Sequence, residues 1–129
     1  MVNVLIVGSG GREHSIGWKL GQSNNVNTVF YAPGNGGTLN NVQISVEDLD
    51  GLANFASENN CFTVVGPEAP LAMGIVDMFN EMGLKIFGPT KEAAQLESSK
   101  IWAKQFLKRN NISTTSFEVF DDAVKAKEY

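Results

Sequence analysis

The chain has 129 residues, of which 43% are hydrophobic and 19% charged, a composition typical of a globular domain with a core of its own. Its net charge of −4 argues against nucleic acid or an acidic membrane surface as a partner. No apolar run approaches the roughly 20 residues that span a bilayer. Met1-Val2-Asn3 lacks the basic residues of a signal peptide, and Cys61, the single cysteine, excludes an internal disulfide. We expect a cytoplasmic protein.

The first half of the chain alternates strands with helices. The nearly continuous apolar run Val2–Val7 is typical of a parallel strand that is buried on both faces. A helix is expected over Arg12–Gln22 and a second strand over Thr28–Ala32. A short strand is expected around Val42–Val46. Ser45–Asp48 has the pattern of a capping box for a helix that runs to about residue 59.

The pattern continues through the middle of the chain. Phe62–Val65 is a further buried strand, and the next helix carries apolar residues from Leu71 to Met82 at helical spacing, with Gly83 as its stop. Leu84–Phe87 is the last strand of this series. Alternation of this kind predicts an α/β fold, a Rossmann-like open parallel sheet with helices on both faces.

After Thr90 the pattern changes. A helical segment is expected to about Asn110, followed by a strand at Ser116–Phe120 and a helix capped by Asp121. One helix and one strand cannot bury a core of their own. We therefore predict a first domain over residues 1–95, and over residues 96–129 a linker helix with the incomplete start of a second domain.

Three unusual loops follow directly after predicted strands. They are Gly8–Glu13, Pro33–Thr38 and Gly66–Pro70. In an open parallel sheet the ligand lies beyond the carboxyl ends of the strands, so these loops should line one edge and one site. The glycine cluster of the first loop leads into a helix, and backbone N–H groups at a helix start are suited to a phosphate.

The first loop departs from the dinucleotide fingerprint G-x-G-x-x-G. Gly8 and Gly10 match, but Glu13 stands at the third glycine position, and no carboxylate ends the second strand to bind ribose hydroxyls. A nicotinamide-binding dehydrogenase is therefore disfavoured. No Gly-Lys-Ser/Thr follows, which excludes a Walker-type loop.

Two charged residues of these loops are candidates for ligand binding. Arg12 is suited to clamping phosphate oxygens, although a salt bridge to Glu13 is the alternative. Glu68, held between two prolines, is suited to gripping sugar hydroxyls, or simply complements a helix dipole. His14, the sole histidine, either hydrogen-bonds a ligand or holds the loop. A metal role for it is disfavoured because no second histidine or cysteine lies nearby.

The remaining candidates lie in the second loop, in the later helix and at the single cysteine. Asn35, Gly37 and Thr38 lie in a loop whose glycines let the backbone approach a ligand closely, or form a plain wide turn. Lys100 and the lysine four residues later share one helix face, which is equally a solvated face. Cys61 has no base beside it, which indicates a packing role.

Five motifs, in this order along the chain, resemble one family. They are Gly10–His14, Ala32–Thr38, Val65–Leu71, Ile86–Thr90 and Ala94–Lys100. Together they resemble the N-terminal part of the phosphoribosylamine–glycine ligase (glycinamide ribonucleotide synthetase) family, which belongs to the ATP-grasp superfamily.

The resemblance implies a carbon–nitrogen ligase of de novo purine biosynthesis. In that family ATP, held by magnesium or manganese, phosphorylates glycine, and the amine of 5-phosphoribosylamine attacks the acyl phosphate. Residues 1–95 would be the substrate-binding pre-ATP-grasp domain, and residues 96–129 the start of the ATP-grasp domain. The resemblance assigns 5-phosphoribosylamine to two groups of loop residues and to one acid: Gly10, Gly11 and Arg12; Asn35, Gly37 and Thr38; and Glu68.

Lys100 resembles the lysine that reaches ATP. Family members are much longer than this chain, so we expect no catalytic or metal-binding residue in it, no tightly bound cofactor, and no ligase turnover without the remainder of the ligase. The alternative is a stand-alone sugar-phosphate or nucleotide-binding Rossmann module without catalysis.

Overall fold

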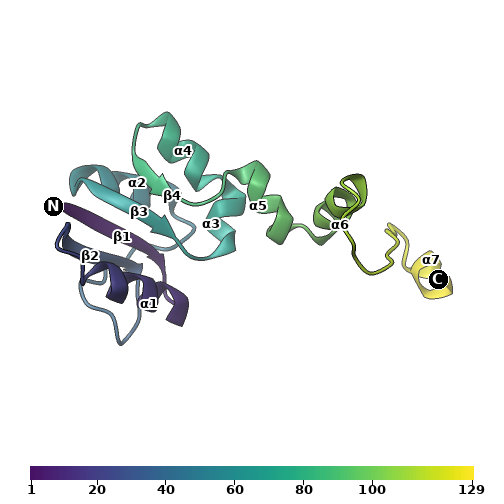
Figure 1. Ribbon diagram of the computed structural model, residues 1–129, viewed down its shortest axis with the longest axis horizontal. Helices are drawn as coiled ribbons and strands as arrows, with labels where there is room; N and C mark the ends of the chain where they lie inside the picture. The colour runs from purple at the N-terminus through teal and green to yellow at the C-terminus, as the bar shows by residue number, and fades with distance from the viewer. The chain divides into compact units, whose positions relative to one another are not determined.

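The computed structural model describes all 129 residues, and their contacts divide the chain into two compact units, residues 1–94 and 95–129. Each unit is described by itself. The first unit contains the sheet (Figure 1). Its strands are β1 (Val2–Gly8), β2 (Val26–Pro33), β3 (Cys61–Val65) and β4 (Lys85–Phe87). The helices of the chain are α1 (Gly11–Leu20), α2 (Leu49–Glu58), α3 (Glu68–Met73), α4 (Ile75–Glu81), α5 (Lys91–Ser98), α6 (Lys100–Arg109) and α7 (Ala123–Glu128).

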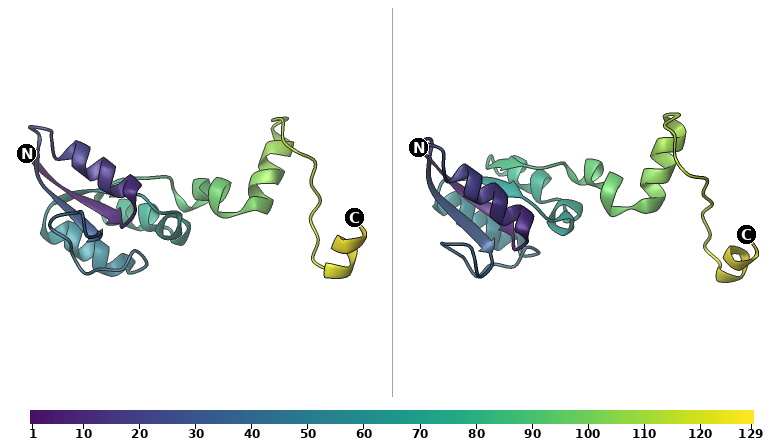
Figure 2. Two further views of the ribbon diagram at one scale, coloured as in Figure 1. Left: turned by 90° about the horizontal axis from the view of Figure 1, so that it is seen from below. Right: turned by 60° about the horizontal axis from the view of Figure 1, so that its bottom comes forward.

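The four strands form one sheet in the order β2-β1-β3-β4, and every pair is parallel. Alternate residues of each strand point to opposite faces. One face carries Leu5 and Val7 and packs against α2 and α4 in the main core, where Phe79 is fully buried. The other face carries Val4 and Ile6 and packs against α1 (Figure 2). The predicted α/β fold with a parallel sheet and helices on both faces is confirmed.

The predicted strand at Val42–Val46 is wrong. Only one isolated parallel bridge, between Tyr31 and Asn41, connects this segment to β2. The side chains of Val42, Ile44 and Val46 nevertheless pack on the main core. The alternation of apolar and polar residues in this segment therefore reflects the packing of one side of an extended segment on the core, rather than pairing in a sheet.

The cap predicted for α2 is also wrong. Asp48 is the N-cap residue, and its Oδ1 accepts a hydrogen bond from the Gly51 N–H at 3.0 Å. Ser45 instead caps the preceding turn, where its hydroxyl accepts from the Glu47 N–H at 3.3 Å. Leu52, Ala53 and Ala56 form the buried face of this helix.

Two predicted single helices are each interrupted. The first divides into α3 and α4 at Gly74, whose φ of +100° lies in the left-handed region. The second divides into α5 and α6 at Ser99, which has extended backbone and accepts a hydrogen bond from the Trp102 N–H at 3.3 Å. The apolar spacing continues across both breaks, so periodicity alone could not reveal them.

Two expectations for the second unit are wrong. Residues 116–120 form no strand. The last helix is capped by Asp122 rather than Asp121, with Asp122 Oδ1 accepting from the Val124 N–H at 2.7 Å. Whether this unit begins an ATP-grasp domain stays a prediction.

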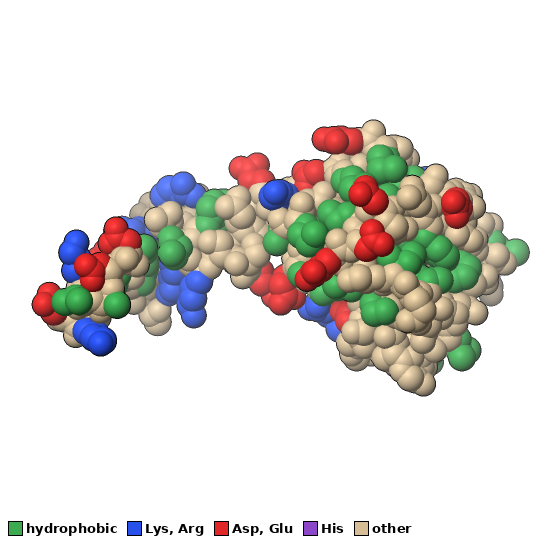
Figure 3. All heavy atoms as spheres, turned by 180° about the vertical axis from the view of Figure 1, so that it is seen from behind, with side chains coloured by type: hydrophobic (Ala, Val, Ile, Leu, Met, Phe, Trp, Pro, Cys, Tyr) green, Lys and Arg blue, Asp and Glu red, His purple; other side chains and the backbone are tan.

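Charge is unevenly divided between the two units. The first contains nine acidic residues and only four basic ones, Arg12, Lys19, Lys85 and Lys91, and the other six basic residues belong to the second. Figure 3 shows this difference on one face of the molecule. An anionic ligand of the first unit must therefore be held by local groups rather than by the field of the whole unit. No helix is long and apolar enough to cross a membrane.

Candidate functional site

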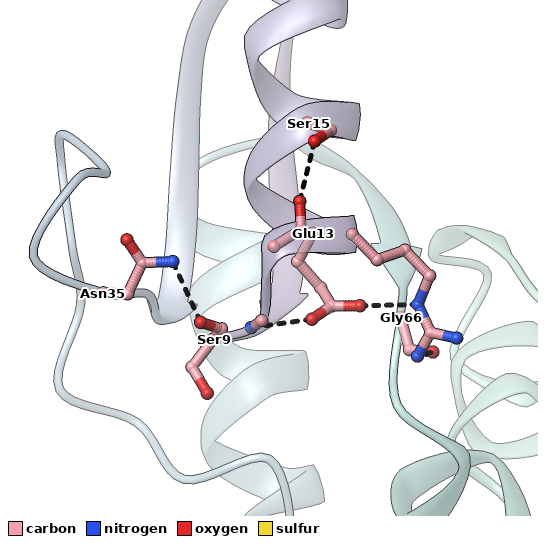
Figure 4. Close-up of polar contacts among 8 residues, drawn as sticks. Ser9, Glu13, Ser15, Asn35 and Gly66 are labelled. Carbon is pink, nitrogen blue, oxygen red and sulfur yellow. Dashed lines mark hydrogen bonds and ion pairs between the residues drawn. The ribbon is translucent and has the colours of Figure 1, made fainter.

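The strand-end loops meet at the carboxyl edge of the sheet. The Gly34 N–H donates to the Gly8 carbonyl at 3.2 Å, and the Gly66 N–H donates to the Val7 carbonyl at 3.1 Å. The Asn35 side chain donates from Nδ2 to the Ser9 carbonyl at 2.9 Å (Figure 4). The loops after β1, β2 and β3 are thus joined directly to one another.

Glu13 is the central side chain of this edge. It is only 5% exposed, and its carboxylate accepts from the Gly10 N–H and from Arg12 Nε, each at 2.8 Å (Figure 4). The same Arg12 guanidinium donates to the Gly66 carbonyl. Glu13 and Arg12 therefore connect the start of α1 to the loop after β3.

Three glycines make room for the Glu13 side chain. A Cβ on Gly8, Gly10 or Gly66 would lie 2.5, 2.7 and 2.1 Å from the nearest Glu13 atom, closer than real Cβ contacts. Gly8 also has a φ of +131°, a conformation that other residues rarely adopt. Glycine is therefore needed at these positions in part because any larger residue would clash with the buried side chain of Glu13.

The electrostatics of Glu13 follow from these contacts. Burial is the largest single influence and raises the pKa of the Glu13 carboxyl. The hydrogen bonds from Arg12, from the Gly10 N–H and from the backbone of Glu13, together with the charge of Arg12, lower it by more. The pKa is therefore lowered from its usual value of 4.5. The residue is an anion at neutral pH. It lies within the first turn of α1, where the helix dipole favours negative charge.

Arg12 forms the salt bridge to Glu13 that was the alternative to a binding role, and its binding role stays a prediction. Its side chain is 59% exposed while it pairs with Glu13. This pairing fixes the direction of the guanidinium at the mouth of the loop. Gly11 beside it is exposed and occupies the first helical position, where a backbone N–H has no acceptor within the helix.

The loop after β2 is held by its own polar side chains. Thr38 Oγ1 accepts from the Asn35 N–H at 2.7 Å, and the Gly37 N–H donates to Asn35 Oδ1 at 2.8 Å. Asn41 Nδ2 donates to the Asn35 carbonyl at 2.9 Å, and Asn41 Oδ1 accepts from the Thr38 hydroxyl at 2.7 Å. The polar atoms of Asn35 and Thr38 therefore shape this wall.

His14 belongs to the same region. It is half-buried, and a Cβ on Gly37 would lie 2.8 Å from its Cε1, so the ring packs against the loop after β2. An open groove of about 480 Å³ runs from here along α1 and the outer edge of β2. Its lining includes Trp18, Tyr31 and Leu39. Gly37 and Thr38 of the loop after β2 also line this hollow, so it adjoins one of the strand ends.

The two remaining predicted site residues, Glu68 and Lys100, belong to different units and are described separately. Glu68 is exposed at the first position of α3, where its charge also suits the helix dipole. Lys100 is exposed at the start of α6 in the second unit. There it borders a hollow of about 270 Å³ together with Phe117 and Lys104, whose Nζ donates to Thr114 Oγ1 and Thr115 Oγ1.

Cys61 begins β3, where it is buried, and burial raises the pKa of its thiol to about 11. It is therefore a packing residue rather than a nucleophile. The structure contains no group of three or more His, Cys, Asp or Glu side chains that could hold a metal ion.

Sequence reasoning missed the structural importance of Glu13 and Asn41. In the sequence Glu13 stands out only as the departure from the dinucleotide fingerprint and as the salt-bridge partner of Arg12. An acidic residue three positions after the helix N-cap is, however, half of a capping box, and that signal was available. No local pattern marks Asn41, because its partners become neighbours only when the loop closes.

A parallel sheet with helices on both faces and a glycine-rich loop after its first strand is typical of the Rossmann-like class of ligand-binding domains, to which this fold belongs. Residues 2–97 match the family model described as phosphoribosylglycinamide synthetase, N domain. The match covers most of the chain, and the chain belongs to this family. The resemblance drawn from the five sequence motifs is thereby confirmed.

Relatives agree with this assignment. The chain is 54% identical over 134 aligned residues to the phosphoribosylamine–glycine ligase of Vibrio vulnificus strain YJ016, an alignment that covers 99% of this chain and 31% of the relative. Identity is 52% to that of Pseudomonas aeruginosa and 50% to that of Chlorobaculum tepidum, again over 99% of this chain and 31% and 32% of those relatives. The chain thus spans about a third of the length of these proteins.

Proposed function

We propose that this chain is the part of an ATP-dependent ligase that binds 5-phosphoribosylamine, which the complete ligase joins to glycine to give glycinamide ribonucleotide in the cytoplasm. The observation that carries the proposal is the joining of three strand-end loops at one sheet edge by Glu13, Arg12 and Asn35. Such an edge is where open parallel sheets bind ligands. Membership of the family supplies the substrate class.

The first loop would hold the phosphate. The Gly11 N–H and the positive end of the α1 dipole favour an anion, and Arg12 adds the only cation of this loop. The Gly10 N–H already donates to Glu13, so its part is to position the loop. Arg12 is oriented by two protein contacts, which reduces the entropy lost when a ligand binds.

The other two loops would form the walls of the site. Asn35 and Thr38 fix the second wall through their mutual hydrogen bonds, and the exposed Gly37 allows a close approach of the ligand to backbone. Glu68 would accept hydrogen bonds from the ribose hydroxyls. Its carboxylate is exposed, and so is accessible to a ligand.

ATP and Mg²⁺ or Mn²⁺ belong to the proposed complete ligase. When bound there, ATP supplies the phosphoryl group that activates the glycine carboxylate. Among the residues of this chain, Lys100 would contribute one cationic contact to ATP, since it is exposed beside a hollow in the second unit. Ligands for the metal would come from the remainder of the ligase.

Calorimetric titration of the chain with ribose 5-phosphate, a stable analogue, tests the proposal. We expect binding that is weakened about tenfold or more by Arg12→Ala, because a hydrogen bond to a charged group contributes roughly 1.5–3 kcal/mol. Lys19→Ala, which removes an exposed cation from the other end of α1, is the matched control and should change affinity less than twofold. Tighter binding of NADH than of ribose 5-phosphate, or an equal effect of the two substitutions, would contradict the proposal.

A further inference from the structure

An apolar groove lies on the α1 face of the sheet. It has a volume of about 440 Å³ and only apolar residues line it. Ile16 and Leu20 of α1 line it together with residues of all four strands, among them Phe62, Val64 and Phe87 of β3 and β4. The groove lies wholly within the first unit.

Strand register builds the floor of this groove. Ile6 pairs with Val64 and Val64 with Phe87, so these three side chains form one row across the sheet. Burial falls along the row: Ile6 is fully buried, Val64 is 8% exposed and Phe87 is 67% exposed. The apolar surface thus continues beyond the part of the sheet that α1 covers.

The two faces of the sheet are covered unequally. On the main-core face α2 contacts β3 and α4 contacts β4. On the other face α1 makes its principal contacts with β1 and β2. Strands are about 4.8 Å apart and a helix with its side chains is about 10 Å across, so the half formed by β3 and β4 is wide enough for one additional helix.

We propose that this groove is the docking site for an amphipathic helix supplied by the part of the ligase that this chain does not span. The inference rests on the proposed function, since it requires that the chain act within a protein of the relatives' length. The chain spans only 31% of the Vibrio vulnificus relative, so more than two thirds of such a protein is available to cover the groove. A contiguous apolar groove that ends in an exposed aromatic ring is typical of a surface that another element buries.

The groove also specifies the chemistry of the docking helix. An apolar stripe at helical spacing would face Phe62 and Phe87, which supply aromatic surface for a groove-bound helix. Lys85 of β4 pairs in register with Phe62 of β3, and Lys85 is exposed. A carboxylate on the flank of the docking helix would therefore pair with Lys85.

Hydroxyl-radical footprinting tests this inference. The probe is a chimera in which this chain replaces the matching region of the Vibrio vulnificus ligase, compared with the 129-residue chain alone. We expect oxidation of Phe87 to fall at least fivefold in the chimera. Trp18, which is 63% exposed and lies outside the groove, is the matched control and should change less than twofold.

A pair of substitutions provides a second readout. Phe87→Asp should leave the Tm of the isolated chain unchanged within about 2 °C, because the ring is exposed there, but should lower the Tm of the chimera by more than Trp18→Asp does. Equal oxidation of Phe87 in chain and chimera would overturn the inference. So would a dimer of the isolated chain, seen by sedimentation, in which Phe87 is already protected, because a second copy would then be the occupant.

ATP-dependent formation of glycinamide ribonucleotide by the chimera separates this inference from the proposed function. An active chimera with unprotected Phe87 overturns the docking site alone. An inactive chimera with protected Phe87, combined with no binding of ribose 5-phosphate by the chain, overturns the proposed function and leaves the docking site supported.

Discussion

Replacing Glu13 tests the reasoning about the strand-end edge most severely. Glu13→Ala removes the acceptor of the Gly10 N–H, a loss of about 1 kcal/mol by analogy with helix caps. It also removes the ion pair with the half-exposed Arg12, worth less than about 1 kcal/mol, and buried aliphatic surface worth roughly 1 kcal/mol. We expect the free energy of unfolding in urea to fall by about 2–3 kcal/mol.

Glu68→Ala is the control, because that carboxylate is exposed and also lies in the first turn of a helix; its cost should stay below about 1 kcal/mol. The pH dependence gives a second readout. The pKa of Glu13 is lowered on folding, so its charge stabilises the protein above pH 4.5 and this contribution is lost as the pH falls through the lowered value. The difference between wild type and Glu13→Gln should therefore shrink at pH 3. Equal stability of wild type and Glu13→Ala at pH 7 would refute the account.

Three further predictions concern single positions of the first unit. Thr63 is fully buried and its hydroxyl has no hydrogen-bond partner, so Thr63→Val should raise the free energy of unfolding by about 1 kcal/mol; a loss of stability in urea would contradict this. Gly74 adopts a φ of +100°, so Gly74→Ala should destabilise by about 1 kcal/mol or more, measured as a lower Tm, and an unchanged Tm would show that the break between α3 and α4 is not required. Burial raises the pKa of Cys61 to about 11, so alkylation at pH 8 should be roughly 100-fold slower than in urea, and equal rates would contradict its burial.

The sequence allowed the layout of the sheet to be predicted well. Runs such as Val2–Val7 are apolar because both faces of a central parallel strand are buried, and that burial is what the structure shows. The glycine-rich loops after the strands indicated where the strands end. Breaks such as Gly74 were missed because the apolar spacing continues through them while the backbone conformation changes.

The candidate site was predictable in position but not in detail. Topology alone placed three loops at one edge, and the hydrogen bonds among Ser9, Asn35, Arg12 and Gly66 join them there. The sequence could not show that Glu13 occupies the space left by three glycines. Gly8 and Gly10 lie in the same loop as Glu13, but Gly66 is more than fifty residues further along the chain. A contact between residues so far apart in sequence forms only when the helical connections between the parallel strands have folded.

The most direct test of the central claim is a map of ¹⁵N–¹H chemical-shift changes on titration of the chain with ribose 5-phosphate. We expect the largest changes on Gly11 and Arg12 and on the loop from Asn35 to Thr38, and we expect Arg12→Ala to weaken them. Changes confined to the amino ends of the strands, or to groove residues outside the strand-end loops such as Trp18 and Gln22, would contradict it.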